Sequence, residues 1–333
     1  MLWFALYTLA AARSAARSSP DLRALQSRLD AIAIAYNTSY SVGVVHPTLG
    51  AFGVAAGIAD KLAGTPATTE TRYPVGSVTK PWTAAAVMQL YEQGLVDIDA
   101  PIETYVDPIL MRGNGTNMTE LWRNKTTGVV DERVHLITAR MAMGMRAGLN
   151  DYNNTWYIDV TENDPTLDIT PFDLLHRLDK HFICDPGSCG KYASTGFELL
   201  GLLLAQVTGA ERWEDYDQLS VIPIGLRDQF TRTAFPGRGL CADVPHVVHQ
   251  YATTKTKSKL PWSPFSSSMP QSIGENVTFE DLFYDSCLNG WTCGNIAAAP
   301  IDIARFHYHL HNLDVVNETV GGAHTHCTRS HTA

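Results

Sequence analysis

The strongest constraint on the fold is Pro81, which directly follows Lys80 at the start of an apolar segment and comes four residues after Ser77. Residues 81–94 carry apolar side chains at the spacing of a buried helix face, and Gly94 is typical of a residue that ends a helix. Pro81 is tolerated only in the first turn of a helix, because it has no N–H to donate. The helix must therefore begin close to Ser77, which places Ser77 and Lys80 on one face of its first turn.

This pair of side chains indicates nucleophilic catalysis. A serine hydroxyl is a weak nucleophile at neutral pH and needs an adjacent base. Lys80 lies within side-chain reach of Ser77 and can accept the hydroxyl proton, while the free N–H groups at the helix start can stabilise an oxyanion. Alone, the S-x-x-K spacing also fits a helix-capping serine followed by a surface lysine. The surrounding sequence has to decide between the two.

The remaining chain predicts helices mixed with few strands. A loop-rich region is expected at 236–278, and the polar stretch 114–131 is expected to be an exposed, glycosylated insertion. The predicted regular elements are helices at 23–36, 197–208 and 297–310, and two antiparallel strands at 40–45 and 51–56. This order indicates an α+β (layered α/β) fold.

Composition supports one globular protein without a polyanionic partner. Of 333 residues, 45% are hydrophobic, which is enough to bury a large core. The net charge of −9 disfavours nucleic acid and anionic membrane as partners, and the apolar run at 2–11 is too short to span a bilayer. A stable membrane span is therefore not expected, and the oligomeric state is left open.

The N-terminus and the sequons indicate secretion. Residues 1–18 combine an apolar run with following small residues, as in a signal peptide, and 19–333 then form the mature domain. The alternative is a buried first helix, since no basic residue precedes the apolar run. Seven N-x-S/T acceptors predict glycosylation at Asn37, Asn114, Asn117, Asn124, Asn153, Asn276 and Asn317.

Six cysteines are consistent with a disulfide framework in an oxidising compartment. Local spacing favours the pairs Cys184–Cys189 and Cys287–Cys293, which leaves Cys241 to pair with Cys327. Six buried free thiols are the alternative.

Several segments resemble the serine β-lactamase and penicillin-binding-protein family. The stretch 73–86, Y-P-V-G-S-V-T-K-P-W-T-A-A-A, is similar to that family around its nucleophile, and 57–60, 95–102, 147–152 and 290–306 resemble further family segments in the same order. The closest branch is that of class C β-lactamases, DD-peptidases and esterases. The resemblance implies a β-lactamase/transpeptidase-like fold, with an antiparallel sheet flanked by helices and a helical subdomain. It also implies Ser77 as nucleophile and Lys80 as base.

The family's second motif, Y-x-N, corresponds to Tyr192-Ala193-Ser194. The resemblance implies that Tyr192 is a second proton shuttle, which assists acylation and activates the deacylating water; a core tyrosine is the alternative. Ser194 stands where the family has asparagine, and its shorter side chain makes fewer hydrogen bonds to position a substrate amide.

The family's third motif, K-T-G or H-x-G on a late strand, has only a partial counterpart in His324-Thr325-His326. We therefore expect the C-terminal strands to be missing and the oxyanion site to be incomplete. The histidines of the tail, of 307–311 and of 246–249 are interpreted as exposed side chains, so no metal and no cofactor are predicted.

Two functions remain open at this point. One is a secreted serine hydrolase that forms an acyl-enzyme at Ser77 on an ester, small-peptide or lactam carbonyl. The other is a catalytically impaired glycoprotein of the same fold that acts by binding. The predicted partner is a small molecule or peptide in the extracellular space or secretory lumen.

Overall fold

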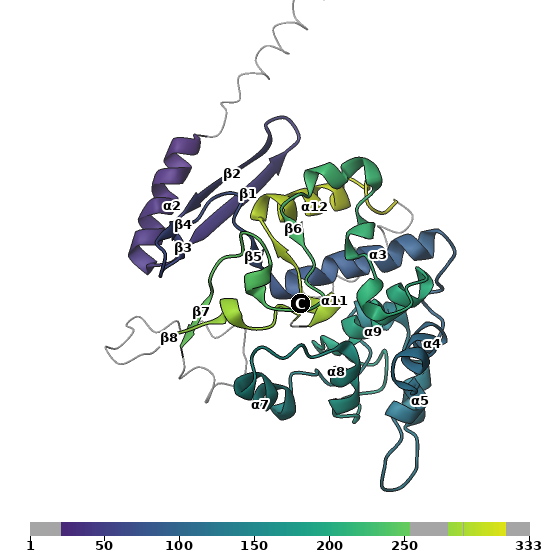
Figure 1. Cartoon of the computed structure of the whole chain (residues 1–333). Helices are drawn as coiled ribbons and strands as arrows, with labels where there is room; N and C mark the ends of the chain where they lie inside the picture. The colour runs from purple at the N-terminus through teal and green to yellow at the C-terminus, as the bar shows by residue number, and fades with distance from the viewer. Residues whose placement is uncertain (1–20, 254–278, 289, 318–333) are drawn as a thin grey trace, which may run out of the picture.

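The computed structural model describes residues 21–253, 279–288 and 290–317 (Figure 1). The expected signal peptide, the sequon at Asn276, Cys327 and the partial third motif at His324 all lie outside these residues.

In the described chain one helix and a group of strands come first, a run of helices follows, and short strands and two further helices come last. The longer helices are α2 (Leu22–Tyr36), α3 (Lys80–Glu92), α4 (Glu103–Asn114), α7 (Thr155–Asn163), α8 (Pro171–Arg177), α9 (Thr195–Val207) and α12 (Pro300–His311). The shorter ones are α5 (Met118–Leu121), α6 (Ala139–Met143) and α11 (Trp291–Gly294). The strands are β1 (Tyr40–His46), β2 (Gly50–Ala56), β3 (Ile58–Asp60), β4 (Thr65–Pro66), β5 (Tyr73–Pro74), β6 (Thr233–Ala234), β7 (Tyr251–Thr253), β8 (Phe279–Asp281) and β9 (Ala297–Ala298). Single 3₁₀ turns lie at Gly76–Thr79, Glu132–Leu136, Trp213–Asp215, Gln218–Val221, Ile224–Gln229, Cys241–Asp243 and Leu282–Tyr284.

A β-hairpin between two helices forms one side of the molecule. Strands β1 and β2 pair antiparallel from Tyr40↔Ala56 to His46↔Gly50, as the two apolar runs around a turn predict. Helix α2 buries Leu29 against one face of the hairpin. Helix α12 covers the other face so closely that a Cβ at Gly43 would lie 2.4 Å from the backbone of Ile301. This layer is visible at the upper left of Figure 1.

Helix α3 runs through the middle of the protein. Its side chains are buried on nearly all sides, which explains the run Ala84-Ala85-Ala86: small residues let neighbouring elements approach closely. Trp82 stacks on Phe306 of α12 with ring centroids 3.9 Å apart. The predicted start is confirmed, because α3 begins at Lys80 after one 3₁₀ turn and Pro81 lies in its first turn.

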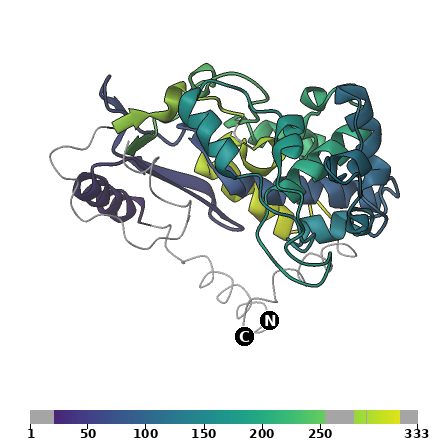
Figure 2. The same cartoon turned by 90° about the horizontal axis from the view of Figure 1, so that it is seen from below.

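The other side is a helical subdomain around α9, visible on the right in Figures 1 and 2. The apolar segment of α9 is buried from Thr195 to Ala205 and packs against α3, α4, α6 and α11. The segment 114–131 differs from the expected exposed insertion. It forms the short helix α5, and Met118 and Trp122 are buried in the main core, so this segment is anchored by apolar side chains between its polar ones.

Small sheets bring distant segments to the start of α3. Strand β9 lies between β5 and β6, with Ala298 opposite both Tyr73 and Thr233, and Val75 N–H donates to Ile296 O at 2.9 Å. Strands β7 and β8 pair antiparallel elsewhere. The architecture is the predicted mixture of antiparallel strands, flanking helices and a helical subdomain. Among the described helices, none is both long and apolar enough to cross a membrane.

Candidate active site

Ser77 and Lys80 meet at the start of α3. Ser77 lies in the 3₁₀ turn and is exposed, whereas Lys80 is only 6% exposed. The Lys80 Nζ donates to Ser77 Oγ at 2.9 Å, and the backbone N–H of Lys80 donates to Ser77 O. A lysine buried in this way is not the surface lysine of a simple helix-cap motif. The geometry therefore favours the nucleophile-base interpretation of the pair.

The Lys80 ammonium is oriented by a main-chain carbonyl and two rings. Its Nζ donates to Cys293 O on α11 at 3.1 Å. It also lies 4.9 Å from the ring centroid of Tyr192 and 5.6 Å from that of Phe197, which is cation–π distance for both. These contacts hold the amine beside Ser77 Oγ, where it can exchange a proton with the hydroxyl.

Tyr192 is the third member of the site, although it is 115 residues away from Ser77 in sequence. Its Oη shares a hydrogen bond of 2.5 Å with Ser77 Oγ. The tyrosine is 53% exposed, so the core-tyrosine alternative does not describe it. The structure thus brings together the three residues for which the sequence predicts proton transfer and nucleophilic attack.

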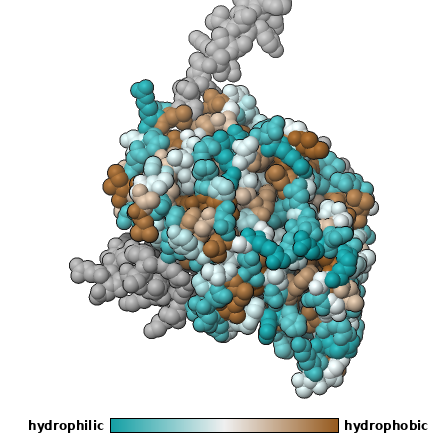
Figure 3. Space-filling model, in the orientation of Figure 1, coloured by the Kyte–Doolittle hydropathy of each residue, from teal (hydrophilic) through white to brown (hydrophobic). Residues whose placement is uncertain are grey.

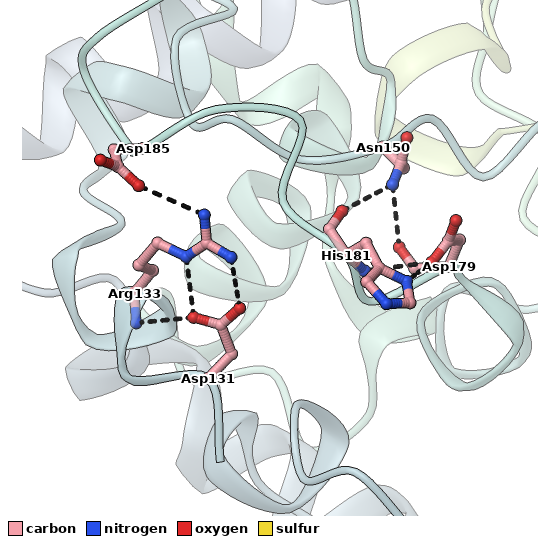
Figure 4. A network of polar contacts seen from close by, with 6 residues as sticks. All are labelled: Asp131, Arg133, Asn150, Asp179, His181 and Asp185. Atoms are coloured by element: carbon pink, nitrogen blue, oxygen red, sulfur yellow. Dashed lines mark hydrogen bonds and ion pairs between the residues drawn. The ribbon is translucent and has the colours of Figure 1, made fainter. Parts of the chain in front are cut away.

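The loop that carries Tyr192 is fastened to residues 145–150. Backbone N–H groups of Ile183, Gly187 and Lys191 donate to the carbonyls of residues 148, 146 and 145 at 2.8–2.9 Å. Figure 4 shows the side chains around this loop: Asn150 Nδ2 donates to His181 O at 2.6 Å, and Arg133 bridges its neighbour Asp131 and Asp185. The predicted disulfide Cys184–Cys189 closes the loop, with Cα atoms 6.3 Å apart.

Gly148 lies very close to the backbone of the Tyr192 loop. Its φ is +70°, and a Cβ there would lie 2.3 Å from Cys184 O. A side chain at this position would both strain the backbone and displace the loop. The glycine within the Ala-Gly-Leu-Asn-Asp-Tyr segment therefore lets the Tyr192 loop approach.

Ser194 lies at the start of α9 and is 8% exposed. Its backbone N–H faces the half-buried carboxyl of Asp151 and lowers its pKa, which connects the Tyr-Ala-Ser motif to the Asn-Asp-Tyr segment. Burial raises the pKa of Asp151, while the N–H groups of Ser194 and Asn153 and the charge of Lys80 act in the opposite direction. A substrate-positioning role for the Ser194 hydroxyl remains a prediction.

Three buried polar residues beneath Lys80 were not anticipated from the sequence. Glu198 on α9 is fully buried, the Tyr152 hydroxyl lies 3.2 Å from Cys293 Sγ, and Cys293 is a free thiol. Burial raises the pKa of Glu198 to about 8 and raises the pKa of the Cys293 thiol. Glu198 could have been noticed, because it is the single charge in the apolar run F-E-L-L-G-L-L-L-A.

The predicted pair Cys287–Cys293 is wrong. Cys287 is bonded to Cys241, with Cα atoms 4.5 Å apart. Residues around these two cysteines lie antiparallel, since Cys241 N–H donates to Asp285 O and Cys287 N–H to Gly239 O. Cys293 is turned inward by the helix that begins after Gly290, so it faces Tyr152 instead. The pairing Cys241–Cys327 is excluded by the same bond.

The sequons differ in exposure. Asn37, Asn114, Asn124 and Asn317 are exposed, and Asn117 and Asn153 are half-buried. In Figure 3 hydrophilic residues dominate the face over α4 and α5, close to three of these sites. Glycosylation stays a prediction at each of them. In the described ranges no group of three or more His, Cys, Asp or Glu side chains is arranged to hold a metal ion.

Comparison with known proteins gives the site a family context. A family model described as Beta-lactamase matches residues 35–331. Esterase EstB from Burkholderia gladioli is 28% identical over 185 residues, a match that spans 55% of this chain and 44% of the esterase, less than half of its length.

Solved structures show the same fold. The D-amino acid amidase from Ochrobactrum anthropi SV3 superimposes with a TM-score of 0.64 at 19% identity, over 90% of this chain and 73% of the amidase. The octameric penicillin-binding protein homologue from Pyrococcus abyssi gives 0.63 at 19% identity, over 91% of this chain and 59% of the homologue. With the family model spanning most of its length, this chain belongs to the Beta-lactamase family.

Proposed function

We propose that the protein is a secreted serine hydrolase that forms an acyl-enzyme at Ser77 on an ester, small-peptide or lactam carbonyl. One observation carries the proposal: Ser77 Oγ is hydrogen-bonded both to Lys80 Nζ at 2.9 Å and to Tyr192 Oη at 2.5 Å. When two proton-transfer groups contact a nucleophile, one can accept its proton as it attacks a carbonyl, and the other can donate a proton to the leaving group.

In acylation, Lys80 accepts the Ser77 proton while Oγ forms a bond to the carbonyl carbon. The tetrahedral intermediate then collapses, the bond to the leaving oxygen or nitrogen breaks, and that atom receives a proton from Tyr192. The Lys80 ammonium restores the Tyr192 proton. In a lactam the leaving nitrogen remains attached to the acyl group.

In deacylation, a water molecule takes the place of the leaving group. Tyr192, which is half exposed, is the group placed to assist this water, because its Oη lies beside the ester oxygen formed at Ser77. Attack of the water breaks the Oγ–acyl bond, and the proton returns to Ser77.

Esters are the first substrate class to test. The curated relative is named an esterase, and Ser194 replaces the longer asparagine that positions substrate amides in the resembled family. A hydroxyl makes fewer hydrogen bonds than a carboxamide, so amide substrates lose more binding than esters do. Small peptides are the second substrate class to test, and lactams are the third.

The proposed compartment is the secretory lumen or the extracellular space. The bonds Cys184–Cys189 and Cys241–Cys287 support it, because disulfides persist in oxidising environments. The exposed sequons support it as well.

The test is covalent labelling of the full chain with a fluorophosphonate, followed by peptide mapping and ester turnover. We expect one adduct, on the peptide that contains Ser77, and neither adduct nor turnover in Ser77→Ala. The matched control is Ser27→Ala, an exposed serine on α2 that should label like the wild type. Labelling of Ser77→Ala at the wild-type rate would remove Ser77 from the mechanism.

A further inference from the structure

Lys80 and Glu198 are linked through one residue of α11, Cys293. Lys80 Nζ donates to the main-chain carbonyl of Cys293 at 3.1 Å. The thiol of the same residue faces the Glu198 carboxyl closely enough to lower its pKa, and the Lys80 charge lowers it further. The base of the proposed mechanism therefore has a buried carboxyl group within electrostatic reach.

The Glu198 carboxyl lacks the partners that a structural carboxylate normally has. The residue is 0% exposed, and neither carboxylate oxygen forms a hydrogen bond of ordinary geometry with any residue that the structure describes. Such a group costs free energy in a core, and a carboxyl that only completed the packing would be replaced by an apolar side chain at no loss. Its position one turn after Ser194 places this cost next to the catalytic centre.

The groups around Glu198 come from four elements. They are Lys80 on α3, Cys293 on α11, Asp151 and Tyr152 in the segment before α7, and Tyr157 on α7. Of these five, only Lys80 carries a positive charge. Burial raises the pKa of both tyrosines and of the thiol, so they stay neutral, while Asp151 opposes ionisation of Glu198. Besides the contact with the Cys293 thiol, Lys80 is thus the neighbour among these five that favours the Glu198 carboxylate, and it does so through its charge.

We propose that Glu198 is a positioning residue whose charge decides at which pH Lys80 can act as the base for Ser77. The inference rests on the proposed function, because it requires Lys80 to accept the Ser77 proton. Glu198 does not touch the substrate and acts through Lys80 alone.

The direction of the effect follows from the sign of the Glu198 charge. As the pH rises through about 8, Glu198 loses its proton, and the resulting negative charge favours the ammonium form of Lys80 over the free amine that activates Ser77. Without the Glu198 charge, the ammonium form is favoured less, so the rising limb of the acylation rate moves toward acid.

The experiment measures the fluorophosphonate labelling rate of Ser77 against pH in the full chain. In Glu198→Gln, which keeps the shape but not the charge, we expect the midpoint of the rising limb to fall by about one pH unit, the lower end of what a nearby opposite charge produces. Glu198→Asp keeps the charge and should retain a midpoint close to that of the wild type. Gln206→Met changes a half-buried polar side chain of α9 whose Oε1 is buried, and should leave the midpoint unchanged.

A second measurement does not depend on labelling. The infrared carbonyl band of the protonated Glu198, identified by its loss in Glu198→Gln, reports the titration of the carboxyl directly. In Lys80→Met the titration should move to higher pH, because coupling between two sites is reciprocal. An unmoved band would overturn the coupling even if a variant at position 198 folds poorly.

The possible failures are distinguishable. A wild type that is not labelled at Ser77 defeats the proposed function, and this inference with it. A labelled wild type with the same pH midpoint in Glu198→Gln defeats this inference alone, as does a shift of equal size in Gln206→Met.

Discussion

The attachment of the Tyr192 loop can be tested by adding a single methyl group at Gly148. A Cβ there lies 2.3 Å from Cys184 O, so the loop must withdraw by about 1 Å to restore van der Waals distance. An L-residue at φ +70° costs about 1–2 kcal/mol, and loss of the hydrogen bond from Ile183 N–H to Gly148 O costs about 1 kcal/mol more. We expect Gly148→Ala to lower the free energy of unfolding by about 2–3 kcal/mol, which lowers the Tm by about 3–4 °C for a chain of this size.

The same displacement should reduce catalysis through Tyr192. A misplacement of about 1 Å can cost about 10²-fold in rate, so Ser77 labelling should slow by about that factor. The matched control is Gly64→Ala, which has the same φ of +70° but no atom within 4 Å of the added Cβ and lies in the turn between β3 and β4. Gly64→Ala should lower the free energy of unfolding through the unfavourable φ alone, and its Ser77 labelling rate should equal that of the wild type.

A double-mutant cycle decides whether the effect passes through Tyr192. In a Tyr192→Phe background, Gly148→Ala should slow labelling no further, because the group that it displaces has already been removed. The reasoning is refuted if Gly148→Ala labels as fast as Gly64→Ala, or if its full effect persists in the Tyr192→Phe background.

Three other predictions concern the proton-transfer residues, a disulfide bond and Glu198. Lys80→Met and Tyr192→Phe should each slow Ser77 labelling by about 10²-fold or more, measured under single-turnover conditions. Labelling at the wild-type rate in both variants would exclude the two residues as proton shuttles. Loss of the Cys241–Cys287 bond, which joins residues 46 apart, should cost about 4 kcal/mol in denaturant unfolding of Cys241→Ala, whereas Cys293→Ala should not change the number of disulfides found by mass spectrometry. Because the pKa of Glu198 is raised from 4.5 to about 8 in the folded protein, unfolded chains release this proton first, so stability should fall by a few kcal/mol between about pH 4.5 and 8. Glu198→Gln should flatten that slope; an unchanged slope would show that another group causes it.

Local sequence patterns were sufficient to predict α2, α3, α9, most of α12 and the reactive pair, whereas α4, α7 and α8 were not predicted. Pro81 determines where α3 can begin, and three residues of helix then determine that Lys80 reaches Ser77. The hairpin of β1 and β2 followed from two apolar runs around a short turn. Tyr192 could be connected to this pair only through the family resemblance, since no local rule relates residues so far apart.

Features that depend on tertiary placement could not be predicted in this way. Spacing favoured Cys287–Cys293, but the partner of Cys287 is determined by the antiparallel contact that brings Cys241 opposite it. The burial of Met118 and Trp122 in the polar segment 114–131 could not be predicted, because a few apolar residues do not form a periodic pattern. The cluster of Glu198, Cys293 and Tyr152 likewise forms only when α9, α11 and the segment before α7 meet.

The contact between Lys80 and Cys293 O has a consequence for how this site can change over time. Every amino acid offers the same carbonyl, so substitution at position 293 leaves the acceptor of the lysine in place. The buried side chain at that position can then be exchanged for others of similar size without loss of this acceptor, and the polarity beneath the reactive centre changes with it. Libraries at position 293, combined with changes at Glu198, offer a route to variants that differ in working pH while Ser77, Lys80 and Tyr192 remain untouched.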